Sequence, residues 1–247
     1  MSISPAWHAR SLRFFGKDRL KIPKKRPKLT TCVRRIQAVA NRCACHTEGV
    51  FTFARVSAAL IEHRVAVAAN LPLTAPPVLS VSHSRATGTR LPFGFAYDFR
   101  RSRIGTGPEA FKAAKSAFQR WTPFDLGWAR VANPDARIVA GQVIAVEIRT
   151  LGLWTLNLSR IREVTDTPTS FGFIYVTTTD HVERGEERFF IEFDPASGDV
   201  AYELEAFSRP RHPLAILGFP LSRSFQHRFA RDSHRRMREK AHDAHRP

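Results

Sequence analysis

The densest run of side chains able to carry out chemistry lies between positions 181 and 187, where one histidine and three glutamates fall within seven residues. These residues are His181, Glu183, Glu186 and Glu187. Imidazole and carboxylate groups transfer protons near neutral pH, and both also bind metal ions. The segment therefore has three interpretations: a structural corner, an acid/base pair formed by His181 and Glu187, or a metal site. We favour the structural corner and expect no resident metal or other cofactor.

The segment 175–210 is expected to form two long antiparallel strands that are entered through this corner and joined by the turn Asp194–Gly198. Glu187 alternates in phase with apolar residues, so it is expected on the inner face of the sheet, with Glu186 on the opposite face. A carboxylate on the inner face needs a partner, because an unpaired buried charge is costly. We expect Arg209 or Arg211 to supply that partner.

Further strands are indicated by residues that alternate between apolar and polar character. One strand is expected within 93–99, and a series follows between Trp128 and Ala206. In that series the segment 171–178 is apolar or aromatic on both faces, which is typical of a central strand. Turn residues separate consecutive strands, so their pairing is predicted to be antiparallel.

Three helices are expected around these strands. The first falls within 51–69, with apolar positions at Phe53, Val56, Leu60, Val65 and Val67. The second begins after a Thr106 cap, with Pro108 in its first turn and Glu109 three residues beyond the cap, and it ends at Pro123. Its apolar stripe consists of Phe111, Ala114, Phe118 and Trp121. The third is a long amphipathic helix over about 214–242, with apolar positions at Leu221, Phe225, Phe229 and Met237.

The order of elements is strand, helix, about six strands and a long helix, which predicts an α+β fold. In this fold a curved antiparallel sheet of six to seven strands grips the C-terminal helix. Such an arrangement commonly leaves a cavity between sheet and helix, and small-ligand sites are concave and mostly apolar. Six aromatic residues are expected to line it: Trp121, Trp128, Trp154, Phe173, Tyr175 and Phe225. The alternative is that these rings form an ordinary packed core.

Positive charge is concentrated at the two ends of the 247-residue chain, whose net charge is +17. Residues 1–50 hold 12 Lys and Arg against 2 acidic residues, and residues 222–247 hold 8 against 3. Basic segments that contain proline are usually solvated, so we expect residues 1–50 to be a disordered extension. A targeting segment or a start-codon artefact would have the same composition. Residues 51–242 are expected to form a single domain, followed by a tail at 243–247.

The three cysteines, Cys32, Cys43 and Cys45, all lie in the basic extension. One residue separates Cys43 from Cys45, a spacing that matches neither a zinc knuckle nor a haem attachment motif. Because the rest of the chain has no cysteine, a cytoplasmic protein with reduced thiols is favoured. No apolar run approaches the roughly 18 to 20 residues needed to cross a bilayer, so we expect no membrane span.

Several of these segments together resemble a known family. They are Gly105–Gly107 before Phe111–Ala114, Trp121–Trp128, Gly141, Gly172–Thr177, His181 with Gly185–Phe189, Ser208–Pro210 and Gln226. Over roughly Val56 to Met237 the chain resembles the domain of unknown function 1990 family, although Thr178 stands where that family often has leucine. The family is functionally uncharacterised, so the resemblance implies no reaction, cofactor or catalytic residue. Its order of elements is similar to the helix-grip fold of START-like and pollen-allergen-like proteins, which mostly bind hydrophobic ligands.

Three hypotheses about function follow. The first is that the protein binds a small hydrophobic or amphipathic molecule between the sheet and the C-terminal helix. The second is a hydrolase or isomerase that uses His181 and Glu187, so whether the protein is an enzyme stays open. The third, which we consider unlikely, is that the basic ends bind nucleic acid or an acidic partner. The sequence leaves the ligand and the oligomeric state undetermined.

Overall fold

The computed structural model describes residues 51–75, 77, 79, 94–211 and 219–243 of the chain. The basic extension 1–50 with its three cysteines lies outside the described residues, as do positions 212–218 and 244–247. Within the part that is described, no helix is long and apolar enough to cross a membrane.

The described strands form one antiparallel sheet of eight strands. Their bounds are β1 Phe51–Thr52, β2 Ala96–Thr106, β3 Ala129–Val131, β4 Val143–Thr150, β5 Leu153–Asp166, β6 Ser170–Thr177, β7 Glu183–Phe193 and β8 Asp199–Pro210. The strand order is β2-β8-β7-β6-β5-β4-β3, and β1 pairs with β5 off this path. The short β6 is buried almost throughout and lies in the middle of the sheet, which confirms the predicted central strand.

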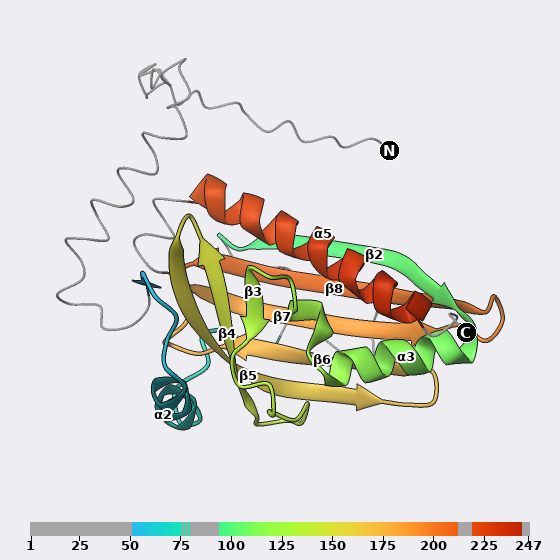
Figure 1. The fold of residues 1–247 in the computed structure, drawn as a ribbon, viewed down its shortest axis with the longest axis horizontal. Helices are drawn as coiled ribbons and strands as arrows, with labels where there is room; N and C mark the ends of the chain where they lie inside the picture. The colour runs from blue at the N-terminus through green and yellow to red at the C-terminus, as the bar shows by residue number, and fades with distance from the viewer. Residues whose placement is uncertain (1–50, 76, 78, 80–93, 212–218, 244–247) are drawn as a thin grey trace, which may run out of the picture.

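Two helices lie over the same face of the curved sheet (Figure 1). They are α3, Gly107–Gln119, and the long C-terminal helix α5, Phe219–Asp243, and a short 3₁₀ helix η1, Thr122–Phe124, follows α3. The helix α5 runs along the sheet and packs against α3, β2 and η1. The predicted α+β architecture, a curved antiparallel sheet gripping a long C-terminal helix, is thus confirmed. Below, this side of the sheet is called the inner face.

The two ends of α3 differ in part from the sequence prediction. Thr106 is the N-cap residue and a proline lies in the first turn, but the Thr106 side chain caps no backbone amide. Its hydroxyl oxygen instead accepts a hydrogen bond from Arg103 at 2.6 Å. The helix ends at Gln119, before the predicted stop at Pro123. It stops early because Trp121 adopts a left-handed backbone conformation with φ of 58°, which cannot continue a right-handed helix.

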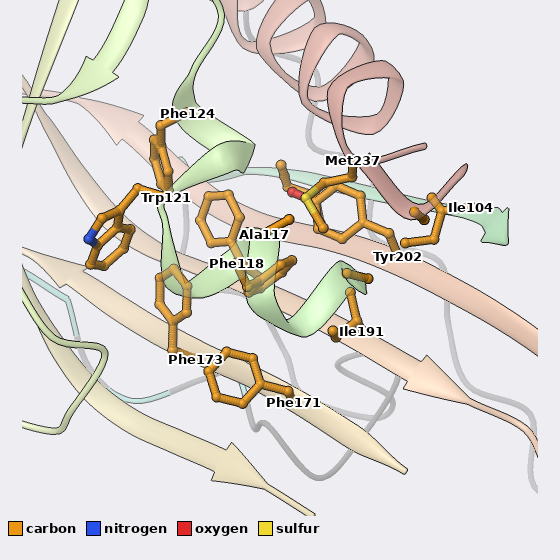
Figure 2. Close-up of a cluster of buried hydrophobic side chains, with 14 of the residues drawn as sticks. Ile104, Ala117, Phe118, Trp121, Phe124, Phe171, Phe173, Ile191, Tyr202 and Met237 are labelled. Carbon is orange, nitrogen blue, oxygen red and sulfur yellow. The ribbon is translucent and has the colours of Figure 1, made fainter. Parts of the chain in front are cut away.

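The main core fills the space between α3, the C-terminal half of α5 and the inner face (Figure 2). Phe118 on α3 is fully buried and makes edge-on ring contacts with Phe171, Phe173 and Tyr202 from the sheet. Met237 on α5 is fully buried in the same cluster. Because the core takes up this end of the inner face, any space for a ligand must lie toward the N-terminal end of α5.

The opposite, outer face of the sheet is also covered. The helix α2, Ala58–Ala68, buries Ile61 and Ala68 against Leu156 and Leu158 of β5. Leu79 forms a second small cluster with Ile174 and Phe207. Of the apolar positions predicted for α2, Val56 and Val65 pack against the cluster of Ile61 and Ala68, whereas Phe53, Leu60 and Val67 are 65%, 43% and 43% exposed. Leu60 and Val67 are seven residues apart and share one side of α2, but the side that faces the sheet is the neighbouring one, which carries Ile61 and Ala68.

Charged side chains on the outer face are buried in ion pairs. Arg188 is fully buried, and its Nη1 lies 2.8 Å from Oε2 of Glu203 and 3.3 Å from Oε2 of Glu205. Glu186 is buried on the same face, where it pairs with Arg162 and accepts the backbone N–H of Leu79 at 3.0 Å. Glu186 is thus held by a cation and a backbone amide on the outer face, the face on which alternation predicted it.

Candidate functional site

A cavity of about 220 Å³ lies between the inner face and the N-terminal half of α5. Its floor is formed by the strands β4, β5, β6, β7 and β8, and the turn between β4 and β5 and the segment 181–182 also line it. The rings of Phe225 and Phe229 close it from the side of α5, and Phe124 of η1, a member of the main core, lines it 5.5 Å from Phe229 between ring centroids. The curvature of the sheet leaves this space because α3 and η1 fill only the other end of the inner face.

Most of the cavity wall is apolar. Trp128 lies 6.1 Å from Phe225 and 6.4 Å from Phe229 between ring centroids, so three rings from two elements meet there. On the sheet, the inner-facing side chains of β4 include Val146 and Ile148. Leu151 and Leu153 extend the wall at the β4–β5 turn. A wall of this kind holds an apolar body without specifying its orientation.

One end of the cavity is polar and acidic. Asp98 of β2, Glu183 and Glu187 of β7, His181 and Gln226 all line this end. Four of these come from the family-like segments or the charged corner, whereas Asp98 comes from the first long strand. The polar end would orient a ligand whose apolar part lies against the aromatic wall.

Gln226 of α5 connects the helix to the sheet at this end. Its Nε2 donates hydrogen bonds to both carboxylate oxygens of Glu183, at 3.0 and 2.8 Å, and lies 2.9 Å from Oγ of Ser208. The Oε1 atom of Gln226 accepts from Arg223 at 2.7 Å. Arg223 in turn forms a two-point ion pair with Asp98. This chain of contacts fixes the N-terminal half of α5 over the acidic residues.

Glu187 is placed on the inner face, as alternation predicted, but its expected arginine partner was wrong. The hydroxyl of Tyr175 donates a hydrogen bond to Oε2 of Glu187. In the register of β7 with β8, Glu187 pairs with Ala206, whereas Arg209 lies three residues further along. An odd number of residues reverses the face, so Arg209 lies on the outer side, where its guanidinium packs 5.8 Å from the ring of Phe95. Arg211 instead donates to the backbone carbonyl of Thr179.

The environment of Glu187 favours its neutral form. Burial raises the pKa of the Glu187 carboxyl to about 7, and the negative charges of Glu183 and Asp98 act in the same direction. The hydrogen bond from Tyr175 opposes this shift because it stabilises the carboxylate. A carboxyl group with a pKa near neutrality, in a cavity, can exchange a proton with a bound molecule. Burial likewise raises the pKa of Glu183, while its hydrogen bonds from Gln226 and Ser208 lower it.

His181 is held in its neutral form at the edge of the same space. Its Nδ1 lies 3.0 Å from the backbone nitrogen of Glu183, which donates, and 3.1 Å from the backbone carbonyl oxygen of the same residue, which accepts. Burial lowers the pKa of His181 to about 4. The Nε2 atom of His181 has no partner among the described residues, so the neutral ring presents this nitrogen to a bound molecule. No group of three or more His, Cys, Asp or Glu side chains in the described ranges is arranged to hold a metal ion.

The structure brings together only half of the six aromatic residues expected at the cavity. Trp128, Tyr175 and Phe225 line it. Trp121 and Phe173 lie in the main core instead, with their ring centroids 5.6 Å apart (Figure 2). Trp154 lies on the outer face, where the guanidinium of Arg55 packs 4.8 Å from its ring.

The error at Trp154 has a physical cause. On β5 the polar residues Thr155, Asn157 and Ser159 face the cavity, whereas Leu156 and Leu158 face α2. Alternation separates the two faces of a strand but does not say which one is inner, and here both faces are covered. Sequence reasoning also missed Asp98, Phe124 and a role for Gln226. Gln226 and Phe124 carried a signal, because both belong to segments of the family resemblance, whereas Asp98 carried none.

Comparison with known proteins places the chain in a family. The family described as Domain of unknown function (DUF1990) matches residues 80–236. A UPF0548 protein of Dictyostelium discoideum is 37% identical over 150 residues, which are 56% of this chain and 69% of that protein. A UPF0548 protein of Arabidopsis thaliana is 32% identical over 146 residues, which are 57% of this chain and 70% of that protein. A crystal structure of Ara h 8.0201 is similar with a TM-score of 0.40 and 15% identity, covering 60% of this chain and 98% of that one.

The chain belongs to this family of unknown function, as the sequence pattern predicted. The matched region begins at residue 80, later than the expected start near Val56, and ends at residue 236, next to the expected Met237. It includes Asp98, His181, Glu183, Glu187 and Gln226, so the polar end of the cavity lies within the family region. The family description names no activity.

Proposed function

We propose that the protein binds a small amphipathic molecule in the cavity between the sheet and α5. The observation that carries this proposal is the combination of a mostly aromatic and aliphatic wall with one acidic end. An apolar body against Trp128, Phe225 and Phe229 would be removed from water, at about 25 cal/mol for each Å² of apolar surface buried. The groups at the polar end would then set its orientation.

A titration with a neutral probe tests this proposal. Naphthalen-2-ylmethanol has a flat apolar body and one hydroxyl group, and its binding can be measured by isothermal titration calorimetry. Ala230 lines the cavity from α5, so Ala230→Phe adds a ring inside it. We expect saturable binding to the unmodified protein and at least a tenfold loss of affinity in Ala230→Phe, about 1.4 kcal/mol.

The matched control adds the same ring outside the cavity. Arg231 is the next residue of α5, and its side chain is 63% exposed. Arg231→Phe should bind the probe as the unmodified protein does. If the probe fails to bind, or if Ala230→Phe binds it as well as Arg231→Phe, the cavity is not a binding site for amphipathic molecules.

A second candidate function is proton transfer to or from the bound molecule. One observation favours it: Glu187, with its pKa of about 7, faces the same cavity as the neutral imidazole of His181. A carboxylate in an apolar site acts as a general base, and a neutral imidazole can stabilise developing negative charge through its N–H group.

The base-sensitive probe 5-nitrobenzisoxazole tests this chemistry, because removal of the proton at C3 breaks the N–O bond and gives a coloured phenolate that carries a nitrile. We expect turnover whose rate rises through pH 7 and disappears in Glu187→Gln. Glu109 on α3 is exposed and distant in sequence from the site, so Glu109→Gln serves as the control. Equal rates in both variants would rule out Glu187 as the base.

A further inference from the structure

The charges that face the cavity are unbalanced. Three carboxylates line it, on Asp98, Glu183 and Glu187, whereas no lysine or arginine is found among the described lining residues. Asp98 is compensated by its two-point ion pair with Arg223. The hydrogen bonds to the Glu183 and Glu187 carboxylates come from uncharged groups: Gln226 and Ser208 for Glu183, and Tyr175 for Glu187.

Glu187 has room for a further partner. Its Oε2 accepts from Tyr175, and no described residue donates a hydrogen bond to its Oε1. The Glu187 side chain is half-buried, and the part that stays exposed faces the cavity. Complete burial of this carboxylate without a further partner would be costly. A donor with a positive charge, placed in the cavity, would satisfy both the free oxygen and the charge.

The aromatic wall suits the same kind of group. Trp128, Tyr175 and Phe225 line the cavity together with Phe124 and Phe229. The faces of aromatic rings attract cations, with indole the strongest, and an attraction of this type is worth about 0.5 to 2 kcal/mol. Carboxylates and aromatic rings combined, without lysine or arginine, form a wall that attracts organic cations and repels organic anions.

We propose that the ligand of this cavity is an organic amine: an apolar body that carries one protonated nitrogen, which pairs with Glu187 while the body lies against Trp128, Phe225 and Phe229. This inference rests on the proposed binding function and specifies its ligand class. A fatty acid or another carboxylate would face Glu183 and Glu187 with no cationic side chain to bind it. A bare metal ion would find no group of three suitable ligands among the described residues.

Three probes with the same apolar body separate the ligand class from the binding function. They are naphthalen-2-ylmethanamine, naphthalen-2-ylmethanol and naphthalene-2-carboxylate, titrated calorimetrically at pH 8 into the full chain. We expect the amine to bind at least tenfold more tightly than the alcohol, and the carboxylate at least tenfold more weakly than the alcohol. These differences follow from the charge alone, because the ring system is the same.

Substitution of Glu187 shows whether that residue recognises the amine. In Glu187→Gln the affinity for the amine should fall to the level of the alcohol, whereas the affinity for the alcohol should stay unchanged. Glu109→Gln removes the same charge from an exposed position on α3 and should leave all three affinities as they were. A fall in alcohol binding in Glu187→Gln would mean that the variant has lost the cavity itself.

The pH dependence gives an independent measurement. An ammonium group pairs with the ionised form of Glu187, so the affinity for the amine should rise roughly tenfold from pH 6 to pH 8, while that for the alcohol stays flat. The other charged or titratable groups around Glu187 are Tyr175, Tyr202, Glu183, Asp98, His181 and His227. His227 approaches from the exposed side of α5, so the series is repeated in His227→Gln, where the rise should persist.

The outcomes distinguish the two proposals. If the alcohol binds and the amine binds no more tightly, the amine proposal fails and the binding function stands. If the carboxylate binds best, the amine proposal is also overturned. If none of the three probes binds, the binding function fails and the ligand class fails with it.

Discussion

The hydroxyl of Tyr175 donates its hydrogen bond to Oε2 of Glu187 across the β6–β7 strand pair, where the two residues are direct partners. Both side chains point to the inner face, and both line the cavity. Burial and this carboxylate raise the pKa of the Tyr175 hydroxyl well above its usual value, so the tyrosine keeps its proton and remains the donor. The proton that can be exchanged in this pair is therefore the one on Glu187.

Stability should fall with rising pH because of Glu187. The pKa of this carboxyl is raised from 4.5 to about 7 by folding, so between these values the folded state binds more protons than the unfolded state. Stability from this group is complete below about pH 4.5, declines up to about pH 7 and is level above it. Glu187→Gln removes the penalty and should be more stable than the unmodified protein by about 2 kcal/mol at pH 8.

Chemical denaturation at pH 5 and pH 8 measures this difference. At pH 5 the variant and the unmodified protein should have nearly the same free energy of unfolding, because Glu187 is then mostly neutral when folded. Glu109→Gln should show no such dependence on pH. A Glu187→Gln variant that is equally destabilised at both pH values would contradict the raised pKa.

His181 has the opposite effect on the acid side. Its pKa is lowered from 6.5 to about 4 by folding, so between these values the unfolded state binds more protons. The stability due to neutral His181 is complete above about pH 6.5 and is lost as the pH falls toward 4. His181→Gln keeps an oxygen that can accept a hydrogen bond from the backbone N–H of Glu183. Between pH 6.5 and pH 4 this variant should lose about 2 kcal/mol less stability than the unmodified protein. His63 is exposed, so His63→Gln is the control. If the free energy of unfolding depends on pH in the same way in both variants, His181 does not have a lowered pKa.

Gly185 should tolerate no side chain. A Cβ atom added there would overlap the backbone carbonyl oxygen of Phe207 and lie 2.8 Å from Cα of Ser208, and neither backbone atom can move without separating β7 from β8. We expect Gly185→Ala to lower the free energy of unfolding by at least about 2 kcal/mol. Arg184→Ala, on the same strand and half-buried, should cost less than half as much in the same denaturation experiment. Equal costs would show that the close approach at Gly185 is relieved easily.

Arg188 should be needed only while its carboxylate partners remain charged. Arg188→Met leaves Glu203 and Glu205 buried without this cation, which should cost about 3 to 5 kcal/mol. Adding Glu203→Gln and Glu205→Gln to Arg188→Met should restore at least half of that loss. Urea unfolding of the single and triple variants makes the comparison. A triple variant less stable than Arg188→Met would mean that the carboxylates are held mainly by Arg101 and Tyr97.

Much of the fold could be predicted because its signals are local. The two-sided apolar character of β6 placed it in the middle of the sheet, and alternation along β7 separated Glu187 from Glu186. The site was only partly predictable, because its contacts depend on register and on which face of each strand is inner. Tyr175 meets Glu187 because the β6–β7 register makes them direct partners. Arg209 lies on the opposite face, because an odd number of residues separates it from Ala206, the partner of Glu187 on β8. Trp154 was misplaced because α2 covers the outer face, which the pattern of Leu60 and Val67 did not indicate.

One edge of the sheet is formed by β2, which among the described strands pairs only with β8. A long strand with one free edge can recruit a strand of another molecule and start aggregation. Here Arg100, Arg101 and Arg103 are exposed along that edge, and ion pairs hold Arg101 at Glu192 and Arg103 at Asp199. A second strand could approach only by stripping water from these paired charges, so the arginines of β2 act as gatekeepers that protect the sheet from edge-to-edge association.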